Sequence, residues 1–413
     1  MAIAENQPHL KKRVGLVGVV MFGAGTAIGV SIFSVLEPAA KAAGSGLLVA
    51  VAIAAVPMIL FATLYSFLSS ALPKSGASYE WPRRFIHPSV GFLISWLRIL
   101  GNVGAIVVLA FVLVSYLSAA IVLPIKPTMA AIITAIFFLN YLGVSVAARV
   151  QTVLMVALLM ALGAFVWFGA PQASFATIGP LTARGWFAIA TAVPLMISLF
   201  LGIESSAEIG EEVRDAERTI PRGIALAVLL TAIVYIAISA TALGVIGPAR
   251  LAASPAPLLE AAKGPMGRLA EPLILTAAVV SILKTLNATA LVFSRAIFAM
   301  GRSGALPSAL GRINARFGTP HVALLVCYVA AMLGLFMPQS LTFLLLAVNI
   351  PTMLKYMSSS LSAVNIARHH PEIYAHAVFR PTRATVIVLG WTGILMGMAI
   401  LVAGLGADWR PMH

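Results

Sequence analysis

Long apolar stretches follow one another through almost the whole chain, and they restrict its fold more than any other feature. A helix that crosses the hydrocarbon core of a bilayer needs about 20 apolar residues, and by that measure the sequence contains about eleven crossings. Charged residues make up only 10% of the 413 residues, whereas soluble domains contain roughly a quarter. The sequence therefore predicts an all-α membrane protein. The predicted spans are residues 14–36, 47–72, 90–123, 128–146, 150–170, 186–206, 220–246, 272–299, 322–337, 341–360 and 385–405.

Most basic residues lie in short runs between these stretches. If the N-terminus is cytoplasmic, seventeen Lys and Arg side chains fall on the cytoplasmic side and seven on the other, as the positive-inside rule requires. We therefore assign the formal net charge of +14 to cytoplasmic loops, and expect no nucleic-acid partner. Residues 1–13 are predicted to form the cytoplasmic N-terminal tail of a multi-pass protein of the cell (inner or plasma) membrane. The single cysteine, Cys327, excludes an intrachain disulfide.

Two of the predicted spans contain residues that interrupt a helix, and each leads one half of the chain. The first span carries Gly25 and Gly29, and the sixth carries Pro194 and Gly202. Discontinuous helices at corresponding places in two halves are the best sequence pointer to a transporter's binding site at the bilayer midplane. Five spans per half place the second half upside down relative to the first. The predicted units are an inverted repeat of residues 14–170 (spans 1–5) and 186–360 (spans 6–10), followed by an additional span at 385–405.

Several motifs resemble those of the amino acid-polyamine-organocation (APC) superfamily of transporters. The segment Gly25-Thr-Ala-Ile-Gly-Val-Ser-Ile-Phe33 resembles the GxxIGxGIF signature of that family's first span. Similar stretches follow in the family's order, at residues 73–79 with 91–96, residues 200–204 with 211–222, and residues 286–287 with 294–307. The resemblance extends from about residue 14 to residue 405. It implies a LeuT-type five-plus-five inverted repeat with spans one and six broken, and alternating-access transport of amino acids or related amines.

The first break is the predicted site for a substrate carboxylate. An α-amino acid is a zwitterion, so its site must offer donors to the carboxylate. Free N–H groups at the start of the second half of the first span, at Gly29, Val30 and Ser31, supply them at the positive end of a helix dipole. Ser31 stands where the family motif has glycine, so its Cβ narrows the site while its hydroxyl adds a donor. The alternative is that the glycines only allow close helix packing.

The ammonium group of such a substrate needs acceptors, which the broken helices also provide. Carbonyl groups left unpaired near Ala27, Ser198 and Leu201 are the predicted acceptors, and the family resemblance implies the same positions. A packing role for the glycines of the first span would not explain the second break. The predicted substrate-binding residues are Ala27, Ile28, Gly29, Val30, Ser31, Ser198, Phe200, Leu201 and Gly202.

Two charged residues within the spans are predicted to couple ions to transport. Glu204 is an intramembrane acid, which is functional by default, and the resemblance implies a place beside the substrate and a part in proton sensing. Its alternative role is that of a neutral acid bonded to the unwound backbone. Sodium-independent family members carry a lysine in span five where a sodium would bind, and the matching position here is Leu158. We hypothesise that Lys284 takes over that cationic role. The alternative is a structural bond from Lys284 to backbone carbonyls or to Glu204.

One further charged residue and one charge-rich segment are assigned positions in the predicted topology. Arg98 lies within the third span, either facing the cytoplasmic half of the pathway or anchoring the structure. The charge-rich segment of residues 208–222 is expected to be a solvated cytoplasmic hinge.

The resulting prediction is a secondary active transporter of amino acids. The apolar surroundings of Phe200 and Leu201 favour neutral amino acids, with transport that is sodium-independent and either proton-coupled or an exchange. The alternatives are a transporter of cationic amino acids or polyamines with Glu204 as counter-ion, an amine antiporter, or an exporter. A channel or facilitator is the alternative from another class. The sequence lacks the HExxH, GxSxG and Walker A motifs, so no enzyme activity, metal or cofactor is predicted. The predicted partners are the amino acid, membrane lipid and protons, and the oligomeric state is left open.

Overall fold

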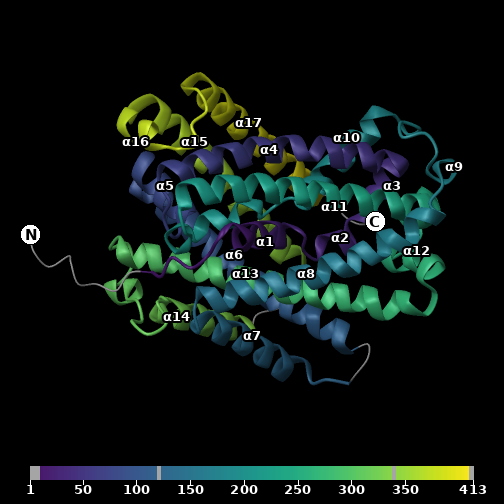
Figure 1. Ribbon diagram of the computed structural model, residues 1–413, viewed down its shortest axis with the longest axis horizontal. Helices are drawn as coiled ribbons and strands as arrows, with labels where there is room; N and C mark the ends of the chain where they lie inside the picture. Colours follow the sequence, from purple (N-terminus) through teal and green to yellow (C-terminus); the bar gives the residue numbers. More distant parts are fainter. Residues whose placement is uncertain (1–9, 119–121, 337–340, 409–413) are drawn as a thin grey trace, which may run out of the picture.

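The computed structural model describes residues 10–118, 122–336 and 341–408, and nearly all of them lie in helices. Over these residues no strand is formed, and only two isolated β-bridges occur, Val14 with Val213 and Ser75 with Ile209. The prediction of an all-α membrane protein is confirmed (Figure 1). The helices are α1 (Leu16–Ala27), α2 (Ser31–Ser34), α3 (Leu36–Ala43), α4 (Leu47–Ala71), α5 (Ala77–Phe85), α6 (Pro88–Ser118), α7 (Ile125–Tyr141), α8 (Val144–Gly169), α9 (Phe175–Ile178), α10 (Gly185–Ser198), α11 (Ala216–Ala253), α12 (Pro257–Met266), α13 (Ala270–Arg302), α14 (His321–Gly334), α15 (Leu341–His369), α16 (Pro371–His376) and α17 (Arg383–Asp408).

A helix lies at the place of every predicted span. Eight segments of the described chain are long and apolar enough to cross a membrane, and α7 and α14 are shorter apolar helices. The tenth predicted span corresponds to α15, which continues to His369. The count of eleven crossings and the division into two inverted repeats stay predictions.

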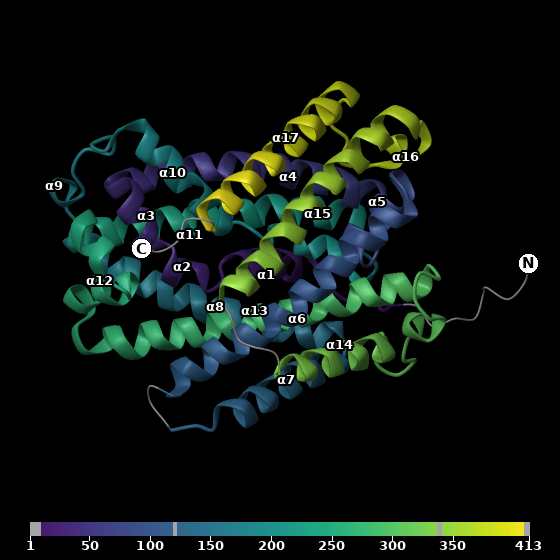
Figure 2. The same cartoon turned by 180° about the vertical axis from the view of Figure 1, so that it is seen from behind.

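The connecting segments gather at two opposite ends of the bundle. In Figure 1 the start of α1, α5 and α16 lie at one end, while α3, α9 and α12 lie at the other. The view from behind shows the same separation (Figure 2). This grouping matches the alternation expected from the distribution of Lys and Arg. Which end faces the cytoplasm stays a prediction.

The first helix is interrupted where the glycine-rich motif lies. It stops at Ala27, residues 28–30 belong to neither helix, and α2 starts at Ser31. A nearly continuous helical run follows, because the Val35 N–H bonds to the Ser31 carbonyl and the Ala39 N–H bonds to the Val35 carbonyl. Pro38 has no N–H to donate to the carbonyl four residues earlier, so the run is counted as two helices, α2 and α3.

The second interruption follows α10. This helix ends at Ser198, residues 199–202 form turns, and a 3₁₀ helix, η3 (Ile203–Glu208), continues the chain. Gly202 has a φ of +104°, a conformation that residues with a Cβ rarely adopt. The glycine at position 202 therefore determines where this helix is interrupted. A second 3₁₀ turn, η4 (Gly210–Glu212), follows before α11.

The loop between α4 and α5 packs between η3 and α13. The Gly76 N–H donates to the Glu208 carbonyl at 2.9 Å, and Gly76 has a φ of +66°. A Cβ built at this glycine would lie 2.6 Å from the Cβ of Ala299 and 2.8 Å from the Arg295 carbonyl oxygen. Only glycine fits here without moving α13.

We expect Gly76→Ala to destabilise the protein by about 2–4 kcal/mol, because it adds left-handed backbone strain to overpacking. The measurement is the thermal unfolding of the purified protein in detergent. Gly163→Ala is the matched control, because Gly163 is helical and has no neighbour within 4 Å of a built Cβ. Alanine favours a helix by about 1 kcal/mol over glycine, so the control should unfold at the same temperature or higher. Equal melting temperatures of the two variants would contradict the assignment.

Candidate functional site

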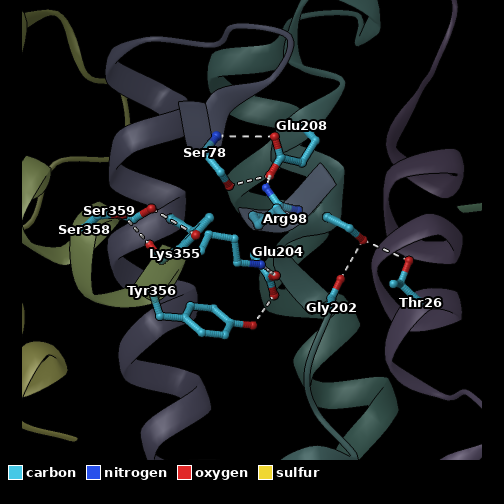
Figure 3. A network of polar contacts seen from close by, with 12 residues as sticks. Thr26, Ser78, Arg98, Gly202, Glu204, Glu208, Lys355, Tyr356, Ser358 and Ser359 are labelled. Carbon is cyan, nitrogen blue, oxygen red and sulfur yellow. Dashed lines mark hydrogen bonds and ion pairs between the residues drawn. The ribbon is translucent and has the colours of Figure 1, made fainter. Parts of the chain in front are cut away.

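The two interrupted helices lie directly against each other. A Cβ built at Gly202 would lie 2.6 Å from the Cγ2 of Thr26, so the backbone of the second break touches the last turn of α1. The Ser205 hydroxyl lies 2.9 Å from the Thr26 hydroxyl, and it also reaches the Gly202 carbonyl at 2.5 Å. Figure 3 shows Thr26 and Gly202 facing each other across this contact. The structure thus brings the two predicted halves of the site together.

A single buried hydroxyl joins the ends of the two broken helices. The Tyr235 hydroxyl, from α11, lies 2.8 Å from the Ala27 carbonyl oxygen and 2.9 Å from the Leu199 carbonyl oxygen. Tyr235 is completely buried and packs edge-on against Phe200. Because the phenol has one proton to donate, the two carbonyls share it. The position of each break therefore depends on the same side chain.

Lys284 holds the carbonyl groups of the first break. Its ammonium group donates to the carbonyl oxygens of Gly25 and Ile28, and the side chain is fully buried in α13. Leu158, the family position for such a lysine, is a buried apolar residue. Lys284 contacts the backbone of the break directly, and the pairing with Glu204 that we considered does not occur.

The free backbone groups of the site differ in detail from the predicted set. The Gly29 N–H donates to the Ala27 carbonyl at 2.7 Å, so neither group is free. Within the described part of the chain, the Val30 N–H has no acceptor, and the Ser198 and Leu201 carbonyls have no donor. The unpaired donor and the unpaired acceptors thus lie on different broken helices.

The negative charge of Glu204, at the start of η3, is balanced by side chains of α15. Its carboxylate accepts hydrogen bonds from the Lys355 ammonium group and, at 2.5 Å, from the Tyr356 hydroxyl. Glu204 and Lys355 are 3% and 4% exposed. Figure 3 shows both α15 side chains reaching the carboxylate from the same side. Glu204 is therefore a partnered carboxylate, and its charge is balanced by the protein itself.

The expectation of a solvated segment at residues 208–222 is wrong for its first part. Glu208 is 2% exposed and accepts from the Ser78 hydroxyl of α5 and, at 2.8 Å, from the Arg98 guanidinium of α6. Arg98 is thereby placed as an anchor of η3 (Figure 3). A carboxylate in an apolar bundle needs a partner because its charge is costly to bury, and Arg98 supplies it.

The next two acids are paired with α13. Arg295 binds Glu212 through two hydrogen bonds of 2.9 and 2.5 Å, and neither side chain is exposed. Arg302 binds Glu211 through two hydrogen bonds of 2.6 and 2.9 Å. The carboxylates of Glu204, Glu208, Glu211 and Glu212 are thus each paired with a cation of α6, α13 or α15.

Sequence reasoning found Glu204, Lys284 and Arg98 but missed Lys355 as the partner of Glu204. The signal was present, because Lys355 is a basic residue within a predicted span and intramembrane charges pair with one another. Over the described ranges, no group of three or more His, Cys, Asp or Glu side chains is placed to hold a metal ion.

Two broken helices that pack against each other inside an apolar bundle define a membrane transport protein. A family model described as "Amino acid permease" matches residues 14–409. The chain belongs to this amino acid permease family and is an APC superfamily transporter, not an enzyme.

Individual relatives agree with this assignment. An uncharacterized transporter of Mycobacterium tuberculosis is 34% identical over 322 residues, which cover 77% of this chain and 72% of the relative. A branched-chain amino acid permease of Bacillus subtilis is 25% identical over 395 residues, covering 90% of this chain and 84% of the relative. The branched-chain amino acid permease of Lactococcus lactis is 24% identical over 403 residues, covering 90% and 86%.

We expect Glu212→Gln to destabilise the protein by about 3–5 kcal/mol, because it leaves the buried Arg295 without a counter-charge. The double variant Glu212→Gln/Arg295→Met should recover part of this loss. Glu260→Gln is the control: it breaks an exposed pair with Arg250, whose side chain is 64% exposed, and such pairs contribute about 0–1 kcal/mol. Thermal unfolding in detergent measures all three, and similar losses for Glu212→Gln and Glu260→Gln would contradict the analysis.

Proposed function

We propose that the protein transports neutral amino acids by alternating access and without sodium, as a proton-coupled transporter or an exchanger. It acts in the cell membrane with its N-terminus in the cytoplasm. The observation that carries this proposal is that the two breaks contact each other and that each carries unpaired backbone groups. The Val30 N–H is a donor for a carboxylate, and the carbonyls of Ser198 and Leu201 are acceptors for an ammonium group. A zwitterion satisfies both at once.

The proposed substrate site comprises the residues predicted from the sequence, and these residues have different roles. Val30 and Ser31 bind the carboxylate, and Ser198 and Leu201 bind the amine. Gly29 leaves room for the substrate backbone, Gly202 lets the second break pack against Thr26, and the Ala27 carbonyl accepts the hydrogen bond of Tyr235. The site needs no side-chain charge, which suits a substrate whose charges cancel.

A neutral, aliphatic side chain is the best fit to the surrounding residues. Ile28 and Phe200 are completely buried at the two breaks, so the walls beside the backbone groups are apolar. The relatives from Bacillus subtilis and Lactococcus lactis are named branched-chain amino acid permeases. A cationic substrate, the alternative, would require an acid free to bind it, whereas Glu204 is bound to Lys355.

Sodium independence is inferred from Lys284. Its ammonium group binds the Gly25 and Ile28 carbonyls, which are oxygen ligands of the kind that a hard cation selects. The Lys284 amino group takes the place that a bound sodium ion would have to occupy. Protons are the remaining candidate for a coupling ion.

Neutral aliphatic amino acids, branched-chain ones above all, are expected to raise the melting temperature of the purified protein. Binding to the folded state alone stabilises by about 2.7 kcal/mol at 100 times the dissociation constant. A thermal-shift screen against the standard amino acids, in sodium and in choline buffers, makes the measurement. Saturable exchange of a labelled hit in liposomes then separates a transporter from a channel. Stabilisation by none of the neutral amino acids would contradict the proposed substrate.

Lys284→Met is expected to abolish uptake in sodium-free buffer, because the Gly25 and Ile28 carbonyls lose their shared cation. Liposome uptake of the amino acid found in the screen is the measurement. Lys263→Met is the control, since Lys263 is exposed and pairs with Glu260 at the surface. Normal uptake by Lys284→Met, or a sodium requirement of the wild-type protein, would rule out this role for Lys284.

A further inference from the structure

The ammonium group of Lys355 is enclosed by two aromatic rings and one carboxylate. It binds the Glu204 carboxylate and lies 4.5 Å from the ring centroid of Tyr356 and 5.9 Å from that of Tyr65. Tyr65 and Tyr356 are 1% and 0% exposed. A carboxylate combined with ring faces is the chemistry by which proteins recognise alkylammonium ligands.

The walls of this arrangement are held by contacts that do not involve Lys355. The Tyr65 hydroxyl lies 3.0 Å from the Ser359 hydroxyl, and its ring packs edge-on against Trp81 at 5.3 Å. The Tyr356 ring stacks on Phe61 at 4.6 Å between centroids. The Tyr356 hydroxyl donates to Glu204 from the side of α15 (Figure 3). Shortening the lysine would therefore leave the walls in place around an unpaired carboxylate.

The position of this arrangement links it to the substrate. Glu204 is two residues beyond Gly202, whose backbone touches Thr26 at the contact between the two breaks. A second positive charge on a substrate's side chain, reaching past Gly202, would meet the Glu204 region. There it would find the Lys355 ammonium group already bound to Glu204.

We propose that Glu204, Tyr65 and Tyr356 form an alkylammonium-binding site, which Lys355 fills from within the chain. This tethered cation excludes substrates that carry a second positive charge. The inference rests on the proposed function and deepens it, because it assigns the selection against cationic amino acids to one residue. Removing the Lys355 side chain opens the site to a free primary amine.

The first experiment measures binding without transport. Lys355→Ala is purified in detergent, and its melting temperature is recorded with ethylammonium chloride and with potassium chloride at equal ionic strength. We expect ethylammonium to raise the melting temperature of Lys355→Ala by a few degrees more than potassium does, and to leave the wild-type protein unchanged. An equal response of Lys355→Ala to both salts would overturn the proposal.

Two further variants serve as controls. Lys355→Ala/Glu204→Gln removes the carboxylate, so its response to ethylammonium should disappear. Lys263→Ala removes a lysine that is 63% exposed and paired with Glu260 at the surface, and it should show no response. An ethylammonium response in either control would overturn the proposed site. If Lys355→Ala does not fold, Lys355→Gln carries the same test.

The second experiment measures selectivity. In liposomes, L-lysine and L-ornithine should leave wild-type uptake of a neutral amino acid unchanged. In Lys355→Ala they should inhibit this uptake, at concentrations at least tenfold lower than any that inhibit the wild-type protein. Wild-type uptake that cationic and neutral amino acids inhibit equally would overturn the proposal, whether or not the variants fold. If no neutral amino acid is transported, the proposed function fails. The ethylammonium response then still decides whether the site exists.

Discussion

The structure depends on the ion pairs that hold the chain after its second break. Between Ile203 and Val213 the backbone runs as 3₁₀ turns, which have poorer hydrogen-bond geometry than an α-helix. Irregular backbone at membrane depth is tolerated only where protein or a water-filled cavity surrounds it. Cations from α6, α13 and α15 meet the four carboxylates of this stretch. Losing one partner of a buried pair is far more costly than the pair is stabilising, so these contacts fix which helices surround the break.

The two breaks are fastened by different kinds of contact. The first is held by a lysine and a tyrosine that donate to its carbonyls. The second is held mainly by side-chain carboxylates beyond it, together with the shared Tyr235 hydroxyl. Since Tyr235 has one proton for both carbonyl groups, a movement of either broken helix changes the hydrogen bonding of the other. A transporter that changes the exposure of a midplane site needs such a connection between its two discontinuous helices.

Much of this arrangement was predictable from residue types. Gly202 and Pro194 marked the second break, and the glycine motif marked the first, because these residues disfavour a continuous helix. Lys284 stood out as a charge in mid-span. The sequence marked Lys355 as an intramembrane charge that needs a partner, but it did not identify Glu204, because the two residues are 151 positions apart and no periodicity fixes their rotation about their helices. The segment of residues 208–222 appeared solvated because its charges were read without their partners. A run of acids looks the same in sequence whether water or buried arginines compensate it.

An internal counter-ion for Glu204 also follows from the needs of a transport cycle. A carrier must return or reorient its site, and in part of that cycle the site holds no substrate. If a cationic substrate supplied the charge that balances Glu204, the empty carrier would have to bury an unpaired carboxylate, which is strongly unfavourable. With Lys355 bound to Glu204, the charge of this region is the same with and without a zwitterionic substrate. The conformational change then moves no uncompensated charge through the apolar bundle, whichever way the substrate gradient runs.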